Sequence, residues 1–283
     1  MKSSVNLHLF FDVYIEDAPL GVYLRGDRKR FEIDRRIRTN ASNYRFQSKY
    51  NITRYTLDSY KHIPWASETI RIECGNPVFE EIYDEIRLKF PKAAIEKKRS
   101  DTAKKYFHAL NNIELAEESW IFFSPNNDHP FLDHHDKIKQ VLVDADEAAQ
   151  RTGADIVSIP YSHFTESMNF FLPTHHDWGA YGGIFPKLLY ETENSFVISL
   201  NKLLLDSLHI YRLKDLKWIF GSSKKTDRVI RPEDTEFYLS NTKSHVMVIP
   251  KFELCRHYDG YLHISDKIPP LFIPNGFFEN NVL

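Results

Sequence analysis

The chain has 283 residues, with 37 lysines and arginines against 39 aspartates and glutamates. This length suffices for one large domain or two small ones, and the near-neutral charge gives no support for a protein that wraps nucleic acid or holds a membrane surface through basic charge. The two cysteines, Cys74 and Cys255, lack zinc-ribbon spacing, so a disulfide scaffold is excluded and a reducing cytoplasm is the expected compartment.

The first residues contain a lysine and a short apolar run that Asp12 interrupts, with no small-residue cleavage site after it. No signal peptide is therefore predicted. No segment approaches the ~20 apolar residues that a membrane-spanning helix needs. We expect a soluble, cytoplasmic protein that is at most peripheral to the inner face of the cell membrane.

Helical and strand periodicities alternate along the next stretch of the chain. Pro64 and Pro91 stop two helical patterns, Ser100 is placed to cap a third, and one strand is an unbroken apolar run typical of burial on both faces. The predicted elements are helix 43–63, strand 68–74, helix 78–90, strand 93–97, a helix that follows Ser100, and strand 119–124.

A further helix over 133–153, ending at Gly153, and a strand over 154–161 continue the alternation. Short connections between such elements predict an α/β fold with a largely parallel sheet, in which ligands gather beyond the carboxyl ends of the strands. The second half is less regular: we predict a loop over 162–183, an apolar helical stretch over 195–211, a strand over 245–250 and an irregular tail. With no clean linker, the chain is predicted to be one domain.

Polar residues follow the buried strand 119–124, namely Asn126, Asn127, Asp128 and His129. Carboxylate and amide oxygens are hard ligands and imidazole suits Mn or Zn, so this cluster can hold a divalent cation. The alternative is a polar loop of turn-forming residues.

Residues 43–160 resemble the nucleotide-binding half of glycosyltransferases of the A-type fold, close to family 2, in which a strand like "WIFFSPNND" ends in an acidic motif of DxD type. The resemblance implies a Rossmann-like, mostly parallel sheet flanked by helices, with an irregular C-terminal elaboration. It implies a nucleotide-sugar-binding half over about 1–160 and an acceptor-binding half over about 161–283. By the same resemblance Asp128 binds a metal, Mn²⁺ or Mg²⁺, at the donor diphosphate, and Asn126 and Asn127 assist.

Two other positions fit this donor site. Glu73 ends the strand "RIEC", where the resemblance places an acidic residue that reads the base or ribose; the alternative is a surface carboxylate. Arg99 and Asp101 lie at a strand-to-helix junction, where a guanidinium and a helix N-terminus favour phosphate and Asp reaches a ribose or base edge. Alternatively, Ser100 and Asp101 only cap the helix.

The segment "IRPEDTEF" offers Glu233 and Asp234 late in the chain, as the family's "ED" motif does. The resemblance implies that one of them is the general base of an inverting transfer, which a carboxylate can perform. The alternative is a pair of acidic residues at a helix N-terminus.

The tail segment "ELCRHYDGYLH" contains Arg256, His257 and His263. The resemblance implies that His257 or His263 completes the metal shell, and Arg256 is suited to bind the diphosphate. The alternative is a hydrogen-bonded loop over the core.

Two histidine groups, "LDHHD" (132–136) and "THHDW" (174–178), keep a metal-dependent hydrolase open as an alternative, although HxH and HExxH spacings are absent. The leading interpretation puts the first group near the donor and Trp178 in the acceptor pocket. It predicts an inverting transfer from a nucleotide-sugar to a glycan or lipid-linked glycan in surface polysaccharide synthesis, with no nucleic-acid partner. A non-catalytic carbohydrate-binding protein is the third possibility.

Overall fold

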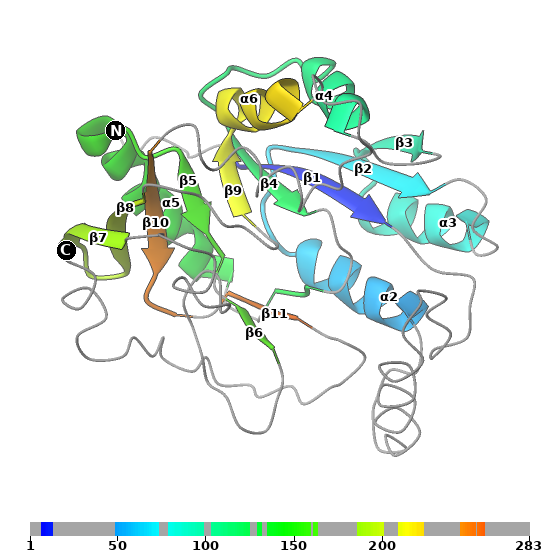
Figure 1. Ribbon diagram of the computed structural model, residues 1–283. Helices are drawn as coiled ribbons and strands as arrows, with labels where there is room; N and C mark the ends of the chain where they lie inside the picture. Colours follow the sequence, from blue (N-terminus) through cyan, green and yellow to red (C-terminus); the bar gives the residue numbers. More distant parts are fainter. Residues whose placement is uncertain are drawn as a thin grey trace, which may run out of the picture.

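The structure is a computed structural model and describes residues 7–13, 49–73, 79–98, 103–124, 129–131, 135–159, 161–163, 186–200, 209–223, 244–252 and 254–257. Its centre is a nine-stranded sheet in the order β3-β2-β1-β4-β9-β5-β10-β8-β7, and a two-stranded sheet of β11 and β6 lies beside it (Figure 1).

The first half of the large sheet is parallel. Strand β1 (Leu7–Val13) pairs with β2 (Ser67–Glu73) on one side and with β4 (Trp120–Ser124) on the other, and β2 pairs with β3 (Ala94–Lys98). The connecting helices are α2 (Lys49–Tyr60), α3 (Phe79–Lys89) and α4 (Ala103–Asn111).

The second half is mixed. Strand β9 runs antiparallel between β4 and β5, β10 pairs parallel with β5, and β8 and β7 add antiparallel strands at the far side. In the small sheet β6 and β11 are parallel. The elements are α5 (His135–Thr152), β5 (Ile156–Ser158), β6 (Tyr161–His163), β7 (Pro186–Glu191), β8 (Ser195–Leu200), β9 (His209–Arg212), α6 (Leu213–Ser223), β10 (His245–Pro250) and β11 (Cys255–His257).

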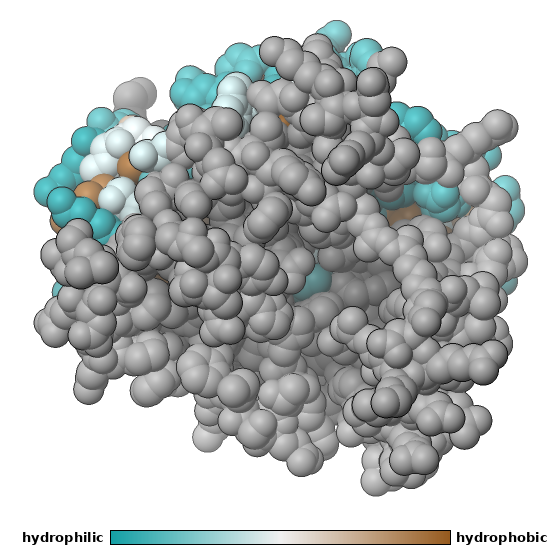
Figure 2. All heavy atoms as spheres, in the orientation of Figure 1, coloured by the Kyte–Doolittle hydropathy of each residue, from teal (hydrophilic) through white to brown (hydrophobic). Residues whose placement is uncertain are grey.

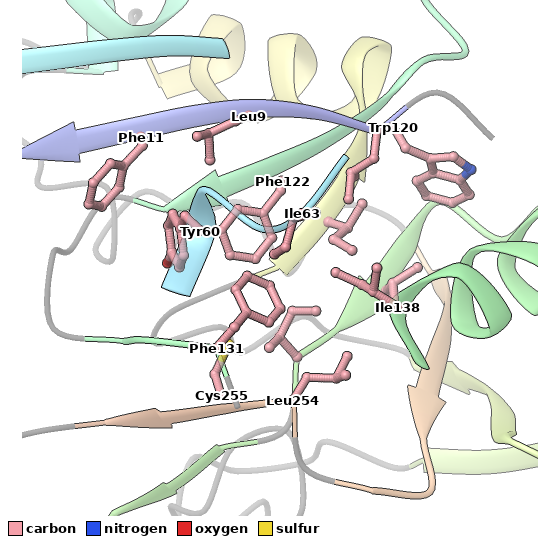
Figure 3. Packing of buried hydrophobic residues seen from close by; sticks show 14 of the residues in the cluster. Leu9, Phe11, Tyr60, Ile63, Trp120, Phe122, Phe131, Ile138, Leu254 and Cys255 are labelled. Atoms are coloured by element: carbon pink, nitrogen blue, oxygen red, sulfur yellow. The ribbon is translucent and has the colours of Figure 1, made fainter. Parts of the chain in front are cut away.

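Helices cover both faces of the sheet, and each face has its own apolar core. One core joins side chains of α2, α3 and α5 to alternate residues of the strands, and Figure 3 shows part of it around Tyr60 and Phe122. The other joins α4 and α6, which lie side by side in Figure 1, to the opposite faces of the same strands. The expected α/β class, a sheet flanked by helices, is confirmed.

Local sequence explains the helix boundaries. In α3, Glu80 and Glu81 lie in the first turn and Arg87 and Lys89 in the last, which complements the helix dipole. Helix α5 ends at Thr152, and the next residue, Gly153, has a φ of 74°, a left-handed conformation that glycine adopts without strain. The Gly153 amide donates to the carbonyl of Ala149 at 3.0 Å and closes the last turn.

The predicted apolar helix over 195–211 is wrong. Its first residues form β8, which pairs with β10 and β7, and its last residues belong to β9, which pairs with β4 and β5. The run of Val197 and Ile198 is buried between two partner strands, so strand pairing and β-branched packing outweigh the helical spacing of the leucines further along. The predicted strand 154–161 is also shorter, since β5 covers Ile156–Ser158 and Tyr161 belongs to the small sheet.

Strand β1 and helix α6 were not predicted. The apolar run before Asp12 is a central strand, whose residues are buried throughout. Among the described helices, none combines the length and the apolar character needed to cross a membrane.

Candidate ligand-binding site at the carboxyl ends of the parallel strands

The order of the parallel strands reverses at β1. The chain moves outward from β1 to β2 and β3, then returns to place β4 on the other side of β1. The strands on both sides end at the same edge, with Val13, Glu73, Lys98 and Ser124 as their last residues. In α/β sheets the crevice beyond such a reversal is where ligands bind.

A buried charged cluster occupies this edge on the face covered by α4. Both carboxylate oxygens of Asp12 accept hydrogen bonds: Arg71 Nη1 lies 3.3 and 3.4 Å from them, and Lys98 Nζ lies 3.0 Å from Oδ2. The hydroxyl of Tyr106, from α4, donates to the same carboxylate. Asp12 is fully buried, and the side chains of Arg71 and Lys98 are 4% and 5% exposed.

Strand register explains why these side chains meet. Asp12 is the partner of Arg71, and Arg71 is the partner of Glu96, so the three point to one face of three adjacent strands. Arg71 Nε lies 3.7 Å from Glu96, whose side chain is 43% exposed, and the Arg71 guanidinium lies 4.7 Å from the centre of the Tyr106 ring. Charges can be buried here because pairing and hydrogen bonding compensate for lost hydration.

Glu73 lies next to this cluster. It is two residues beyond Arg71 on β2 and is the register partner of Lys98 at the end of β3. Its half-buried position at the strand end agrees with the place predicted for it, although its role in binding a base or ribose stays a prediction. A carboxylate beside buried cations can accept hydrogen bonds from ribose hydroxyls or a base edge.

The opposite face of this edge is organised by the last turn of α2. The Tyr60 hydroxyl donates to the carbonyl oxygen of His129 at 3.0 Å and lies 3.3 Å from Ser124 Oγ. The Phe131 amide donates to Ser59 Oγ at 2.9 Å. Helix α2 therefore holds both the end of β4 and the segment 129–131.

Segment 129–131 in turn contacts the late part of the chain. Phe131 forms an antiparallel bridge with Cys255, the first residue of β11. In β11, Arg256 and His257 are the register partners of Ser162 and His163 of β6. The fold thus brings the start of β11, which contains Arg256 and His257, next to segment 129–131, and the diphosphate and metal roles of these residues stay predictions.

Helix α6 leads the chain toward the same edge. Strand β9 is antiparallel to β4 and ends opposite Trp120, so α6 begins at the amino end of the sheet and runs back. Near its end, Phe220 stacks on Tyr106 with ring centroids 4.9 Å apart, beside the Asp12 cluster. The chain then enters 224–243, which contains Glu233 and Asp234.

Most of the predicted site residues lie outside the described residues. Glu73 is described, and Arg256 and His257 are placed through their backbone alone. Arg99, Asp101, Asn126, Asn127, Asp128, Glu233, Asp234 and His263 fall outside, as do Trp178 and the "THHDW" group. Among the described residues, no group of three or more His, Cys, Asp or Glu side chains is arranged to hold a metal ion.

The charged cluster and Tyr60 were missed by sequence reasoning. Asp12 was interpreted as an interruption of an apolar run, yet a single acidic residue inside a buried strand is itself a signal, because it needs a partner. Arg71, alternating with Ile70 and Ile72, is the corresponding basic residue on the neighbouring strand.

In Figure 2, hydrophilic atoms of the described residues are visible near the centre of the view.

Two pKa shifts lie at the other edge, near the amino ends of β1 and β2. Burial lowers the pKa of His8, whose Nδ1 lies 2.8 Å from Ser67 Oγ. Burial raises the pKa of Glu68, and the charge of Lys92 partly opposes this shift. Because both groups lie away from the carboxyl edge, we expect their titration to change stability and not ligand binding.

No family model matches this chain, and a search of curated proteins found no match. Among solved structures, 4-diphosphocytidyl-2C-methyl-D-erythritol synthase from Anaerococcus prevotii is similar with a TM-score of 0.45 and 8% identity, over 87% of each chain. TarS 1-349 from S. aureus, solved in complex with UDP, is similar with a TM-score of 0.46 and 10% identity over 89% of this chain. This chain spans 60% of the length of the TarS chain.

Proposed function

We propose that the protein is a glycosyltransferase that moves a sugar from a nucleotide-sugar donor to a glycan or lipid-linked glycan acceptor. The observation that supports this most directly is the reversal of strand order at β1. Asp12, Glu73 and Lys98 lie at the ends of β1, β2 and β3, and on the other side of β1 the Tyr60 hydroxyl contacts the end of β4 and the His129 carbonyl. This is the position at which α/β sheets bind nucleotides. Surface polysaccharide synthesis is the process we propose.

The donor's nucleoside is assigned to the ends of β2 and β3. Glu73 is proposed to accept hydrogen bonds from the ribose or base. The segment after Lys98 supplies Arg99, for phosphate, and Asp101, for the ribose or a base edge. The Arg71 and Lys98 cations, held in place by buried Asp12, lie beside Glu73 and are proposed to fix the charged surroundings of its carboxylate.

A divalent cation, Mn²⁺ or Mg²⁺, is proposed as the cofactor. Asp128 would hold it with His257 or His263, and Asn126 and Asn127 would assist at the donor. The donor types fit such an ion, and the Phe131–Cys255 bridge supports bringing the two segments together. When bound, the ion would neutralise charge on the leaving diphosphate.

The proposed reaction is a single in-line displacement with inversion. The acceptor hydroxyl oxygen bonds to the anomeric carbon while the bond from that carbon to the diphosphate oxygen breaks. Glu233 or Asp234 takes the hydroxyl proton, and Arg256 is proposed to bind the departing diphosphate, whose charge grows in the transition state.

A thermal-shift panel tests the donor site. UDP, GDP, CMP and dTDP are each added with Mn²⁺, with Mg²⁺ and with EDTA. A ligand that binds only the native state raises the melting temperature, so we expect one nucleotide to do so in a metal-dependent way. Glu73→Ala should reduce that shift, whereas Lys214→Ala, at an exposed ion pair far from the site, should not.

No shift with any nucleotide, together with destabilisation by the chelator alone, would instead support the metal-dependent hydrolase. Nucleotide binding without turnover on any sugar donor would support the non-catalytic alternative. For the catalytic base, Glu233→Gln and Asp234→Asn are compared in a turnover assay with the donor that the panel identifies. We expect one variant to lose about 10²-fold or more of kcat while still binding nucleotide, and full activity in both would rule out this base.

A further inference from the structure

We propose that Tyr60 is a positioning residue, whose hydroxyl fixes β11, and with it Arg256 and His257, against the end of β4. The part of this inference that concerns diphosphate binding rests on the proposed function. The part that concerns the chain itself rests on contacts between described residues.

The Tyr60 hydroxyl joins two parts of the chain. It donates its hydrogen to the His129 carbonyl at 3.0 Å, so at 3.3 Å its oxygen is left to accept from the hydroxyl of Ser124. Tyr60, Ser124 and His129 are each at most 1% exposed. Buried hydrogen bonds of this kind are costly to leave unmade, so one hydroxyl specifies where both segments lie.

The Tyr60 ring cannot easily move. Its centroid lies 5.1 Å from that of Phe11, 5.4 Å from Phe122 and 5.3 Å from Phe131. Figure 3 shows the Tyr60, Phe122 and Phe131 rings gathered between β1 and β11. Aromatic packing on several sides holds the hydroxyl at one point, because rotating the ring would disrupt all of these contacts.

A second hydrogen bond from the same helix turn continues toward β11. Ser59 Oγ accepts from the Phe131 amide at 2.9 Å. Phe131 bridges Cys255, and Phe131, Leu254 and Cys255 belong to one buried cluster with Tyr60. Helix α2 therefore holds segment 129–131 in place, and that segment in turn holds the start of β11.

This arrangement reduces the cost of binding. Arg256 and His257 lie on a strand of three residues, whose described sheet partner is the equally short β6. A strand of that length has few hydrogen bonds of its own, so its bridge to Phe131, which α2 holds, adds to its order. Ordering a binding segment before the ligand arrives saves conformational entropy that would otherwise weaken affinity.

The first experiment compares wild type, Tyr60→Phe and Ser59→Ala by hydrogen exchange, without ligand. Tyr60→Phe keeps the ring packing and removes only the hydroxyl. We expect exchange to rise about tenfold at the amides of His129, Phe131 and 254–257, because loss of one hydrogen bond raises the equilibrium constant for local opening by about that factor. Ser59→Ala should have the same effect at the same two segments.

The matched control is Tyr83→Phe. Its hydroxyl accepts a hydrogen bond from Arg87 Nε at 3.3 Å on the exposed surface of α3, so exchange at 254–257 should not change. Unchanged exchange at 254–257 in Tyr60→Phe would overturn the proposal. Equal acceleration over the whole chain would do so too, because it would indicate general destabilisation.

The second experiment measures the affinity of the same variants for UDP and UMP in the presence of Mn²⁺, or for the corresponding pair if the panel identifies another base. If Tyr60 positions diphosphate-binding residues, Tyr60→Phe should raise the Kd for the diphosphate about tenfold and that for the monophosphate much less. Equal loss for both would overturn the positioning role. Absence of nucleotide binding in wild type would overturn the proposed function and the diphosphate role, and hydrogen exchange would then decide whether Tyr60 fixes β11.

Discussion

The two edges of the large sheet use charge differently. At the amino edge, the ion pairs tie neighbouring elements together: Arg212 lies 3.8 Å over the Trp120 ring and bonds Asp146, which also accepts from Trp120 Nε1. A second ion pair joins Lys214 to Glu118, and His245 Nδ1 lies 2.9 Å from Asp155 Oδ2. These contacts link elements that are far apart in the sequence and neighbours in the fold.

At the carboxyl edge, three charged groups from three neighbouring strands form one buried cluster. Two cations share the carboxylate of Asp12, and a tyrosine hydroxyl from each covering layer binds the strand ends, Tyr106 from α4 and Tyr60 from α2. The comparison teaches that the carboxyl edge holds its polar groups in fixed positions through buried hydrogen bonds on both faces of the sheet. We therefore expect variants at the amino edge to change stability without changing nucleotide binding.

The largest expected effect is that of Asp12→Ala. It removes the carboxylate between Arg71 and Lys98 in a buried site, and we expect the free energy of unfolding in urea to fall by about 3–5 kcal/mol. Glu96→Ala is the control, because that carboxylate is half-exposed and 3.7 Å from Arg71; it should cost less than about 1 kcal/mol. Similar losses in the two variants would contradict the special status of Asp12.

Tyr106→Phe should have the next largest effect. It keeps the stacking on Phe220 and removes one hydrogen bond to a buried carboxylate, so about 1.5–3 kcal/mol of stability should be lost. Chemical denaturation measures this loss. A double variant with Asp12→Ala should lose less than the sum of the two, because both act on one interaction; additive losses would show that they act separately.

At the amino edge, Asp146→Ala should cost about 1 kcal/mol, since it removes the acceptor of Trp120 and the partner of Arg212 in a partly exposed position. Nucleotide affinity should stay at the wild-type value when measured well below the melting temperature. A clear loss of affinity in this variant would break the proposed division between the two edges.

The smallest expected effect is a pH dependence from His8. Because burial lowers the pKa of His8, the unfolded state binds more protons than the folded state below about pH 6.5. The stability that neutral His8 contributes is complete above the pKa of the unfolded state and is lost as the pH falls through the lower pKa of the folded state. The melting temperature should thus decrease between pH 7 and pH 5, and by less in His8→Asn.

The raised pKa of Glu68 acts in the opposite direction, because burial disfavours its charged form and stability from this group is lost as the pH rises. The difference between His8→Asn and wild type isolates the histidine from it. An identical pH dependence in the two proteins would rule out His8 as the source.

The sequence was sufficient to predict elements whose pattern and boundaries agree. Strands β2, β3, β4 and β10 and helices α3 and α5 were predicted nearly in place, because alternation, prolines and glycines mark their limits. The helix predicted over residues 195–211 was wrong because the partners of β8 and β9 come from distant parts of the chain. No local pattern contains that information.

In the candidate site, too, local features were predicted and those that depend on distant contacts were not. The position of Glu73 at a strand end followed from alternation alone. The Asp12 cluster did not, because it depends on register between β1, β2 and β3 and on α4 lying over them. Tyr60 was correctly placed in a helix, but its contact with His129 connects residues 69 positions apart.

The pairing of β1 also sets the order in which the chain can fold during synthesis. Its two partners, β2 and β4, emerge from the ribosome later, and β9, which completes the centre of the sheet, later still. Until β4 is made, the apolar residues of β1 lack one neighbouring strand, and contacts of such long sequence separation slow folding. The exposed flank of β1 would then be open to chaperones or to pairing with another chain, so expression at low temperature or with added chaperone should favour soluble product.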